Sequence, residues 1–104
     1  MTPYIYLFIR KDLSIPQQIV QTAHAVEMVT KKLSQSHPTC HMVLFEAISE
    51  MDLDFISFDL QDRGIKHEIF YEPDVNQRTA IATMPVFGSE RNKFKKFKLK
   101  KWSG

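Results

Sequence analysis

The segment from Ser14 to Ala25 constrains the fold more than any other part of the chain. Ser14 is a favourable helix N-cap, and Gln17 completes an S-x-x-Q capping box with it. Pro16 falls in the first turn, where a helix does not need the missing N–H. A long helix is therefore predicted to begin directly after Ser14, and the apolar run before it, Tyr4–Ile9, predicts a central strand.

This helix has two contrasting faces. At 100° per residue, six apolar residues share one arc, which we expect to pack against the sheet: Ile19, Val20, Ala23, Val26, Val29 and Leu33. Gln17, Gln21 and His24 fall almost opposite, together with Met28. A solvated face more often carries Lys and Glu, so this polar stripe suggests that a second segment returns beside it.

The remaining elements follow from apolar runs, caps and turn residues. The predicted strands are Tyr4–Ile9, Cys40–Ala47, Lys66–Tyr71 and Arg78–Met84, and Phe97–Lys100 alternates as an edge segment would. The predicted helices are the first one, ending near Ser34–Ser36, a second over Glu50–Asp62, and a short one from Ser89. The second helix is expected to bury Leu53, Phe55, Ile56, Phe58 and Leu60. The order βαβαββα predicts one compact α/β domain over residues 1–104, a mixed four-stranded sheet flanked by helices.

Composition narrows the class of protein. Hydrophobic residues make up 43% of the 104 residues and charged residues 25%, as in an ordinary globular domain. No apolar run approaches the roughly 18 residues of a membrane span, and no basic region precedes the first apolar run, so we expect a cytoplasmic protein without a membrane partner. Cys40 is the only cysteine, and His37 and His41 lack a third ligand of defined position. No disulfide, metal site or cofactor is therefore expected.

Positive charge is concentrated near the end of the chain. The formal net charge is +2, but residues 93–101 contain six lysines, so the rest of the chain carries −4. An anionic partner is expected to bind near this segment. A solvated amphipathic surface would explain the same lysines, and the sequence leaves both explanations open.

Gln17, Gln21 and His24 are the first candidates for a functional site. Asp74, in the loop 72–77, and Thr79, in the strand after it, could converge on them. In that strand Thr79 is expected to share one face with Ile81 and Thr83. The convergence of two segments favours a site over ordinary packing.

The same segments resemble the type 2 peptidyl-tRNA hydrolase family over nearly the whole chain. Gln21–Ala25 (QTAHA) is similar to the family's Gln-Cys-Ser-His-Ala segment. Gly64–Ile65 and Arg78–Ala82 (RTAIA) are similar to its Gly-Ile/Leu segment and its Arg-Thr-Val-Leu strand. Glu72–Pro73 and Lys96–Lys100 (KFKLK) look like the shorter peptidyl-tRNA hydrolase domain-containing branch.

The resemblance implies hydrolysis of the ester between a peptide and the terminal ribose of tRNA. It gives Asp74 or His24 the role of base or water-orienting group, with Gln17 and Gln21 as hydrogen-bond donors. Thr79 would hold the neighbouring group. The lysines expected to bind tRNA phosphates are Lys11, Lys93, Lys95, Lys96, Lys98 and Lys100.

Two positions depart from the family's pattern. Gln17 stands where the family carries a lysine, and the acidic loop is shortened around Asp74. A tRNA-directed esterase is therefore one hypothesis, and a non-catalytic RNA-binding or protein-interaction module of the same fold is another. A small-molecule hydrolase using the same cleft is a third. The sequence also leaves open whether the protein is a monomer or a homodimer.

Overall fold

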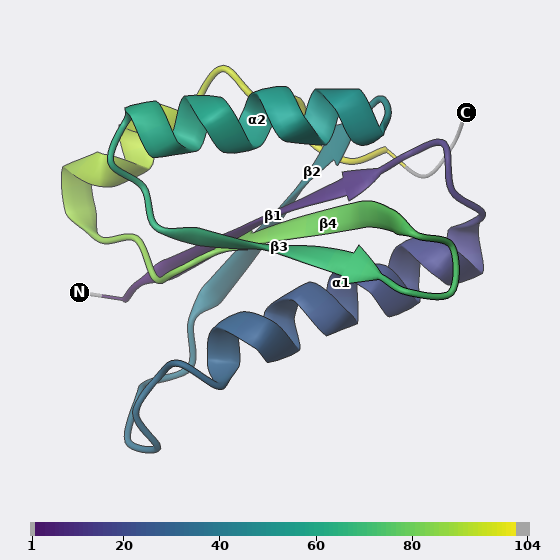
Figure 1. The fold of residues 1–104 in the computed structure, drawn as a ribbon. Helices are drawn as coiled ribbons and strands as arrows, with labels where there is room; N and C mark the ends of the chain where they lie inside the picture. Colours follow the sequence, from purple (N-terminus) through teal and green to yellow (C-terminus); the bar gives the residue numbers. More distant parts are fainter. Residues whose placement is uncertain (1, 102–104) are drawn as a thin grey trace.

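Two helices cover opposite faces of one sheet in the computed structural model, which describes residues 2–101 (Figure 1). The strands are β1 (Tyr4–Arg10), β2 (His41–Ala47), β3 (His67–Glu72) and β4 (Gln77–Thr83). The helices are α1 (Ile15–Thr30) and α2 (Glu50–Asp62), and a 3-10 helix, η1, spans Gly88–Phe94. The predicted βαβαββα order is confirmed, although α1 ends at Thr30, earlier than the expected Ser34–Ser36.

The sheet is mixed, with the strand order β2-β1-β4-β3. β1 and β2 pair in parallel, whereas β4 is antiparallel to both β1 and β3. The loop between β3 and β4 is too short for a parallel crossover, which explains why β4 alone reverses direction. The carboxyl ends of β1, β2 and β3 consequently lie at the same end of the sheet.

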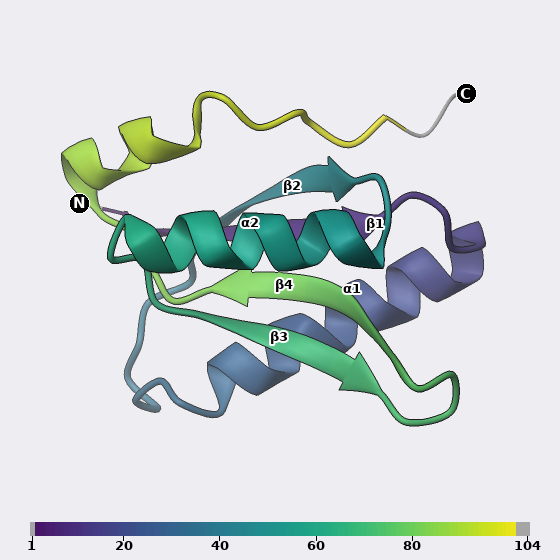
Figure 2. The same cartoon turned by 45° about the horizontal axis from the view of Figure 1, so that its top comes forward.

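The segment after η1 pairs with the outer edge of β2. The amide of Glu46 donates to the carbonyl of Lys98, and the amide of Lys100 donates to the carbonyl of Leu44. The predicted edge segment is thus confirmed, and Figure 2 shows it running beside β2. It covers backbone groups that an open sheet edge would expose.

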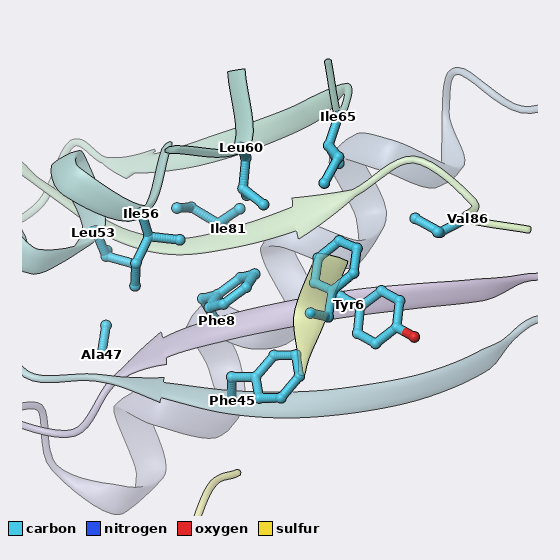
Figure 3. Close-up of a cluster of buried hydrophobic side chains, with 11 residues drawn as sticks. Tyr6, Phe8, Phe45, Ala47, Leu53, Ile56, Leu60, Ile65, Ile81 and Val86 are labelled. Atoms are coloured by element: carbon cyan, nitrogen blue, oxygen red, sulfur yellow. The ribbon is translucent and has the colours of Figure 1, made fainter. Parts of the chain in front are cut away.

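The larger core lies between α2 and the sheet (Figure 3). Leu53, Ile56 and Leu60 of α2 pack over a layer that includes Phe8 and Ile81. Aromatic rings from distant segments fill one end of this core. The rings of Tyr6 and Phe94 stack with centroids 3.8 Å apart, and the ring of Phe45 lies beside them.

The expectation that α2 also buries Phe55 and Phe58 is wrong. Their side chains are 67% and 72% exposed. Leu53, Ile56 and Leu60 already occupy one side of the helix, and at 100° per residue Phe55 and Phe58 project from the opposite side. The outer face of α2 is therefore partly apolar.

The buried face of α1 also differs from the expected one. Ala25 and Val29 pack on the sheet, but Ile19 and Val20 are 60% and 45% exposed, and Ala23 is exposed too. The N-terminal half of α1 instead buries two amides, those of Gln18 and Gln21. Their hydrogen bonds offset the desolvation that would otherwise keep amides at the surface.

The two sides of α2 should respond differently to truncation. Leu60→Ala is expected to lower the free energy of unfolding by about 2–5 kcal/mol, because Leu60 is fully buried. Phe58→Ala removes a larger side chain, yet its effect should stay within about 0.5 kcal/mol because Phe58 projects into solvent. Urea denaturation followed by circular dichroism measures both, and equal losses would contradict the assigned helix orientation.

Candidate functional site

The first turns of α1 meet the carboxyl end of β3 and the start of β4. Gln17 and Gln21 belong to α1, Glu72 closes β3, and Thr79 is the third residue of β4. The carboxyl ends of parallel strands and the N-termini of helices are where α/β proteins commonly bind ligands. The polar stripe of α1 therefore lies at the end of the sheet where a site is expected.

Gln21 joins these three elements through one side chain. It is only 1% exposed. Its Nε2 donates to Oε1 of Gln17 at 3.0 Å and to Oε1 of Glu72 at 2.9 Å. Its Oε1 accepts from the hydroxyl of Thr79 at 2.8 Å. Because both amide N–H groups and the amide oxygen are engaged, the orientation of the Gln21 amide is fixed.

An irregularity in the β3–β4 pairing accounts for the position of Thr79. Phe70 pairs with Ala80, but the next residue, Tyr71, pairs with Arg78, so Thr79 is an extra residue on β4. Such a β-bulge interrupts the alternation of side chains along a strand. The expected common face of Thr79 and Ile81 is therefore wrong. Thr79 points to α1, whereas Ile81 belongs to the core under α2.

Glu72 is the functional candidate that the sequence analysis did not single out. Its carboxylate, half-buried, accepts from Gln21 through Oε1, and no residue of the described chain donates to its Oε2. The alternation of side chains along β3 could have identified it. Phe70 packs on the α1 side of the sheet, and Glu72, two residues later, points to the same side.

His24 and Asp74 are less tightly integrated. The ring of His24 stacks on that of Phe70, with centroids 4.6 Å apart and planes 13° from parallel. Asp74 is exposed in the β3–β4 turn. Within residues 2–101, no hydrogen bond or ion pair links either side chain to Gln17, Gln21 or Thr79. The structure thus brings together three of the five candidates through hydrogen bonds, with Glu72 added.

A second network supports the loop that leads into α1. Arg10 is buried and makes a two-pronged ion pair with Asp12, with nitrogen–oxygen distances of 2.9 and 2.7 Å. Its Nη1 also donates to Oε1 of Gln77 and to the carbonyl of Arg78. The hydrogen bond from Arg10 holds the pKa of Asp12 below its usual value. The charged pair thereby ties the loop before α1 to the start of β4.

Several lysines expected to bind RNA make ion pairs within the protein. Lys93 pairs with Glu90, Lys96 with Asp59 and Lys98 with Glu46. Lys95 is exposed, and Lys11 and Lys100 line one cavity together with Lys101. The predicted basic stretch is therefore partly compensated on the folded surface.

Comparisons with known proteins define the fold but not the activity. No protein-family model matches the chain, and no curated protein matches it. The chain is similar to the solved structure of a protein of unknown function from Agrobacterium tumefaciens strain C58, with a TM-score of 0.67 and 14% sequence identity. The similarity covers 97% of this chain and 99% of that one. The fold is therefore shared over essentially the full length.

No helix within residues 2–101 is long and apolar enough to cross a membrane. The same residues contain no group of three or more His, Cys, Asp or Glu side chains that could hold a metal ion.

The hydrogen bond between Thr79 and Gln21 should contribute measurably to stability. Thr79→Val keeps the shape of the side chain but leaves the buried oxygen of Gln21 without a donor. The free energy of unfolding is expected to fall by about 1–3 kcal/mol. Thr30→Val is the matched control, because the Thr30 hydroxyl lies on the exposed side of α1. Equal effects of the two substitutions in urea denaturation would contradict the role of Gln21 as a buried junction.

Proposed function

We propose that this protein hydrolyses the ester that joins a peptide to the terminal ribose of tRNA. The observation that supports the proposal is the hydrogen-bonded cluster of Gln17, Gln21, Glu72 and Thr79 at the carboxyl end of β3. Three of these residues are the ones assigned by the resemblance to type 2 peptidyl-tRNA hydrolases. The fourth supplies a carboxylate beside them.

In this proposal Glu72 is the general base. A water held at Oε2 of Glu72 loses a proton to the carboxylate as its oxygen adds to the ester carbonyl. The bond between the carbonyl carbon and the ribose oxygen then breaks, and Glu72 returns the proton to that ribose oxygen. The products are a peptide with a free carboxylic acid, which loses its proton to solvent, and a tRNA with a free hydroxyl.

Gln17 is suited to stabilise the oxyanion formed in the addition step. Its Oε1 accepts from Gln21, and its Nε2 has no acceptor among the described residues, in a side chain that is exposed to solvent. A donor already oriented toward the developing charge stabilises the transition state without reorganising. Gln21 acts as a positioning residue, because it holds both Gln17 and Glu72 and is itself held by Thr79.

Replacing Glu72 and Asp74 separately should distinguish the two candidate carboxylates. Glu72→Gln is expected to lower kcat for peptidyl-tRNA hydrolysis by roughly 10²–10⁴-fold, the usual contribution of a general base. Asp74→Asn is a matched control that also removes one carboxylate from the β3–β4 turn region, and it should change kcat less than about threefold. The reverse result would assign the base to Asp74, as the family resemblance first implied.

Replacing Gln17 with lysine tests how the cation that the resembled family carries at this position affects hydrolysis. A charged donor binds an oxyanion roughly twice as strongly as a neutral one, so Gln17→Lys is expected to raise the rate of hydrolysis. A tenfold gain would correspond to about 1.4 kcal/mol of transition-state stabilisation. A wild-type protein that is slowed by Gln17→Lys would instead show that the site depends on the hydrogen bond between Gln17 and Gln21.

The second candidate function is a non-catalytic module that binds RNA or another protein. It is favoured by the exposed apolar side chains on α2, where Met51 and Phe55 are each 67% exposed and Phe58 is 72% exposed. Apolar patches of this kind often mark interaction surfaces. Absence of peptidyl-tRNA hydrolysis by both the wild type and Gln17→Lys would favour this function over the esterase.

A further inference from the structure

The two edges of the sheet differ in how they are protected. The C-terminal segment covers the edge formed by β2, whereas no segment of residues 2–101 pairs with the outer side of β3. Figure 2 shows β3 at this boundary of the sheet. Proteins usually protect an open edge, because its N–H and C=O groups can pair with a strand of another chain.

The pairing of β3 with β4 shows which backbone groups lie on the open edge. The carbonyl of Lys66 accepts from the amide of Met84, so the backbone groups of Lys66 face β4. In an antiparallel ladder these groups alternate in direction from one residue to the next. The N–H and C=O groups of His67, Ile69 and Tyr71 therefore point away from β4.

A hollow of about 870 Å³ follows the first half of this edge. The four successive residues Lys66–Ile69 line it, although their side chains alternate between the two faces of the sheet. Gln61 of α2 borders the hollow on one face, and Lys32, which follows α1, borders it on the other. The hollow therefore runs along the edge of β3, where an added strand would lie.

Two charged groups at opposite ends of β3 have no partner of opposite charge. Lys66 directly precedes the strand, and its exposed ammonium group makes no ion pair within the described chain. Glu72 ends the strand, and among the described residues its carboxylate accepts only from the amide of Gln21. The two residues are six positions apart, so the alternation of side chains places both on the α1 face.

We propose that two copies of this chain form a dimer in which their β3 strands pair antiparallel across a two-fold axis. Ile69 faces Ile69 of the second copy, and His67 faces Tyr71 of the second copy. Each of these pairs exchanges two hydrogen bonds, so all the outward backbone groups of the strand are used. The same register sets Lys66 opposite Glu72 of the second copy.

Symmetry and charge select this register. A two-fold axis perpendicular to the sheet keeps the two faces aligned, so a residue can only face one that lies on the same side of the sheet. The neighbouring register centred on Phe70 would set Glu68 opposite Glu72, and the one centred on Glu68 would set that residue opposite itself. Like charges directly opposite each other destabilise a sheet. Only the register centred on Ile69 brings opposite charges together.

The second copy also contributes apolar surface to the hollow. In this register its Phe70 faces Glu68, and its Tyr71 faces His67, and both of these partners line the hollow. Tyr71 is 45% exposed and Phe70 is half-buried in the single chain. Pairing removes part of both rings from water, which favours association.

The dimer has one consequence for the candidate site. Because Glu72 belongs to that site, the paired strand brings Lys66 of the second copy beside it. Only this consequence rests on the proposed function. The pairing itself rests on the backbone groups, the hollow and the two charges.

Light scattering coupled to gel filtration, with the full chain over a range of concentrations, tests the dimer. The wild type should approach twice its mass of 12.2 kDa as the concentration rises. Tyr71→Pro removes one outward N–H at a position where an edge strand tolerates proline. It should raise the dissociation constant at least about tenfold, because the two-fold axis repeats the lost hydrogen bond.

Tyr71→Ala is the matched control, because it removes the same side chain but keeps the N–H. A wild type that stays monomeric at every concentration would overturn the inference, and so would equal effects of the two substitutions.

Lys66→Glu tests the register without changing the backbone. It sets like charges opposite each other twice in the dimer and should raise the dissociation constant roughly tenfold. Glu72→Gln should weaken the wild-type dimer but strengthen the Lys66→Glu dimer, because it removes an attraction in the first and a repulsion in the second. The same direction of change in both backgrounds would overturn the register. Lys11→Glu, in the loop after β1, is the charge control and should change the dissociation constant less than about twofold.

The remaining outcomes separate this inference from its alternatives. A dimer that resists Tyr71→Pro and Lys66→Glu but dissociates with Phe58→Asp would overturn it in favour of the outer face of α2. If the chain dimerises through β3 but hydrolyses no peptidyl-tRNA, the proposed function fails and the inference stands. If a monomer hydrolyses peptidyl-tRNA, the inference fails and the proposed function stands.

Discussion

The buried amide of Gln21 is the contact on which the arrangement of helix, sheet and candidate site depends. It lies where α1 crosses the ends of β3 and β4, and it hydrogen bonds to one residue from each of these strands. An amide in this position would be strongly destabilising without partners. With its partners in place, it fixes which face of α1 meets the sheet and leaves Ile19 and Val20 at the surface. The polar junction therefore sets the packing of the apolar residues around it.

The bulge in β4 makes this junction possible. An uninterrupted strand would direct Thr79 to the α2 side with Ile81, and the oxygen of Gln21 would lose its donor. Bulges redirect single side chains at little cost to the rest of a sheet. The same irregularity lies next to Arg78, whose side chain pairs with Asp54 at the start of α2. This single shift in register therefore positions Thr79 on the α1 face of the sheet and Arg78 on the α2 face.

The lysine-rich end of the chain has a structural role as well as a charge. It supplies Phe94 and Phe97 to the core under α2, and its backbone pairs with β2. Lys96 and Lys98 meet carboxylates that the fold places opposite them. The Lys96–Asp59 pair lies at the surface and contributes little to stability, whereas the Glu46 side chain that meets Lys98 is only 8% exposed. The lysines beyond them, Lys100 and Lys101, line a cavity at the start of α1.

The sequence by itself determined the order of elements, the mixed sheet and the cap at Ser14, and it suggested that Thr79 or Asp74 converges on the polar stripe of α1. These depend on local backbone chemistry, on loop length and on recognisable motifs. Only the tertiary structure decided which arc of α1 is buried and that Glu72 is the carboxylate bound to Gln21. Periodicity cannot choose between two arcs that both carry apolar residues. The bulge arises only when β3 and β4 pair, and a hydrogen bond between residues 51 positions apart arises only when helix and sheet meet.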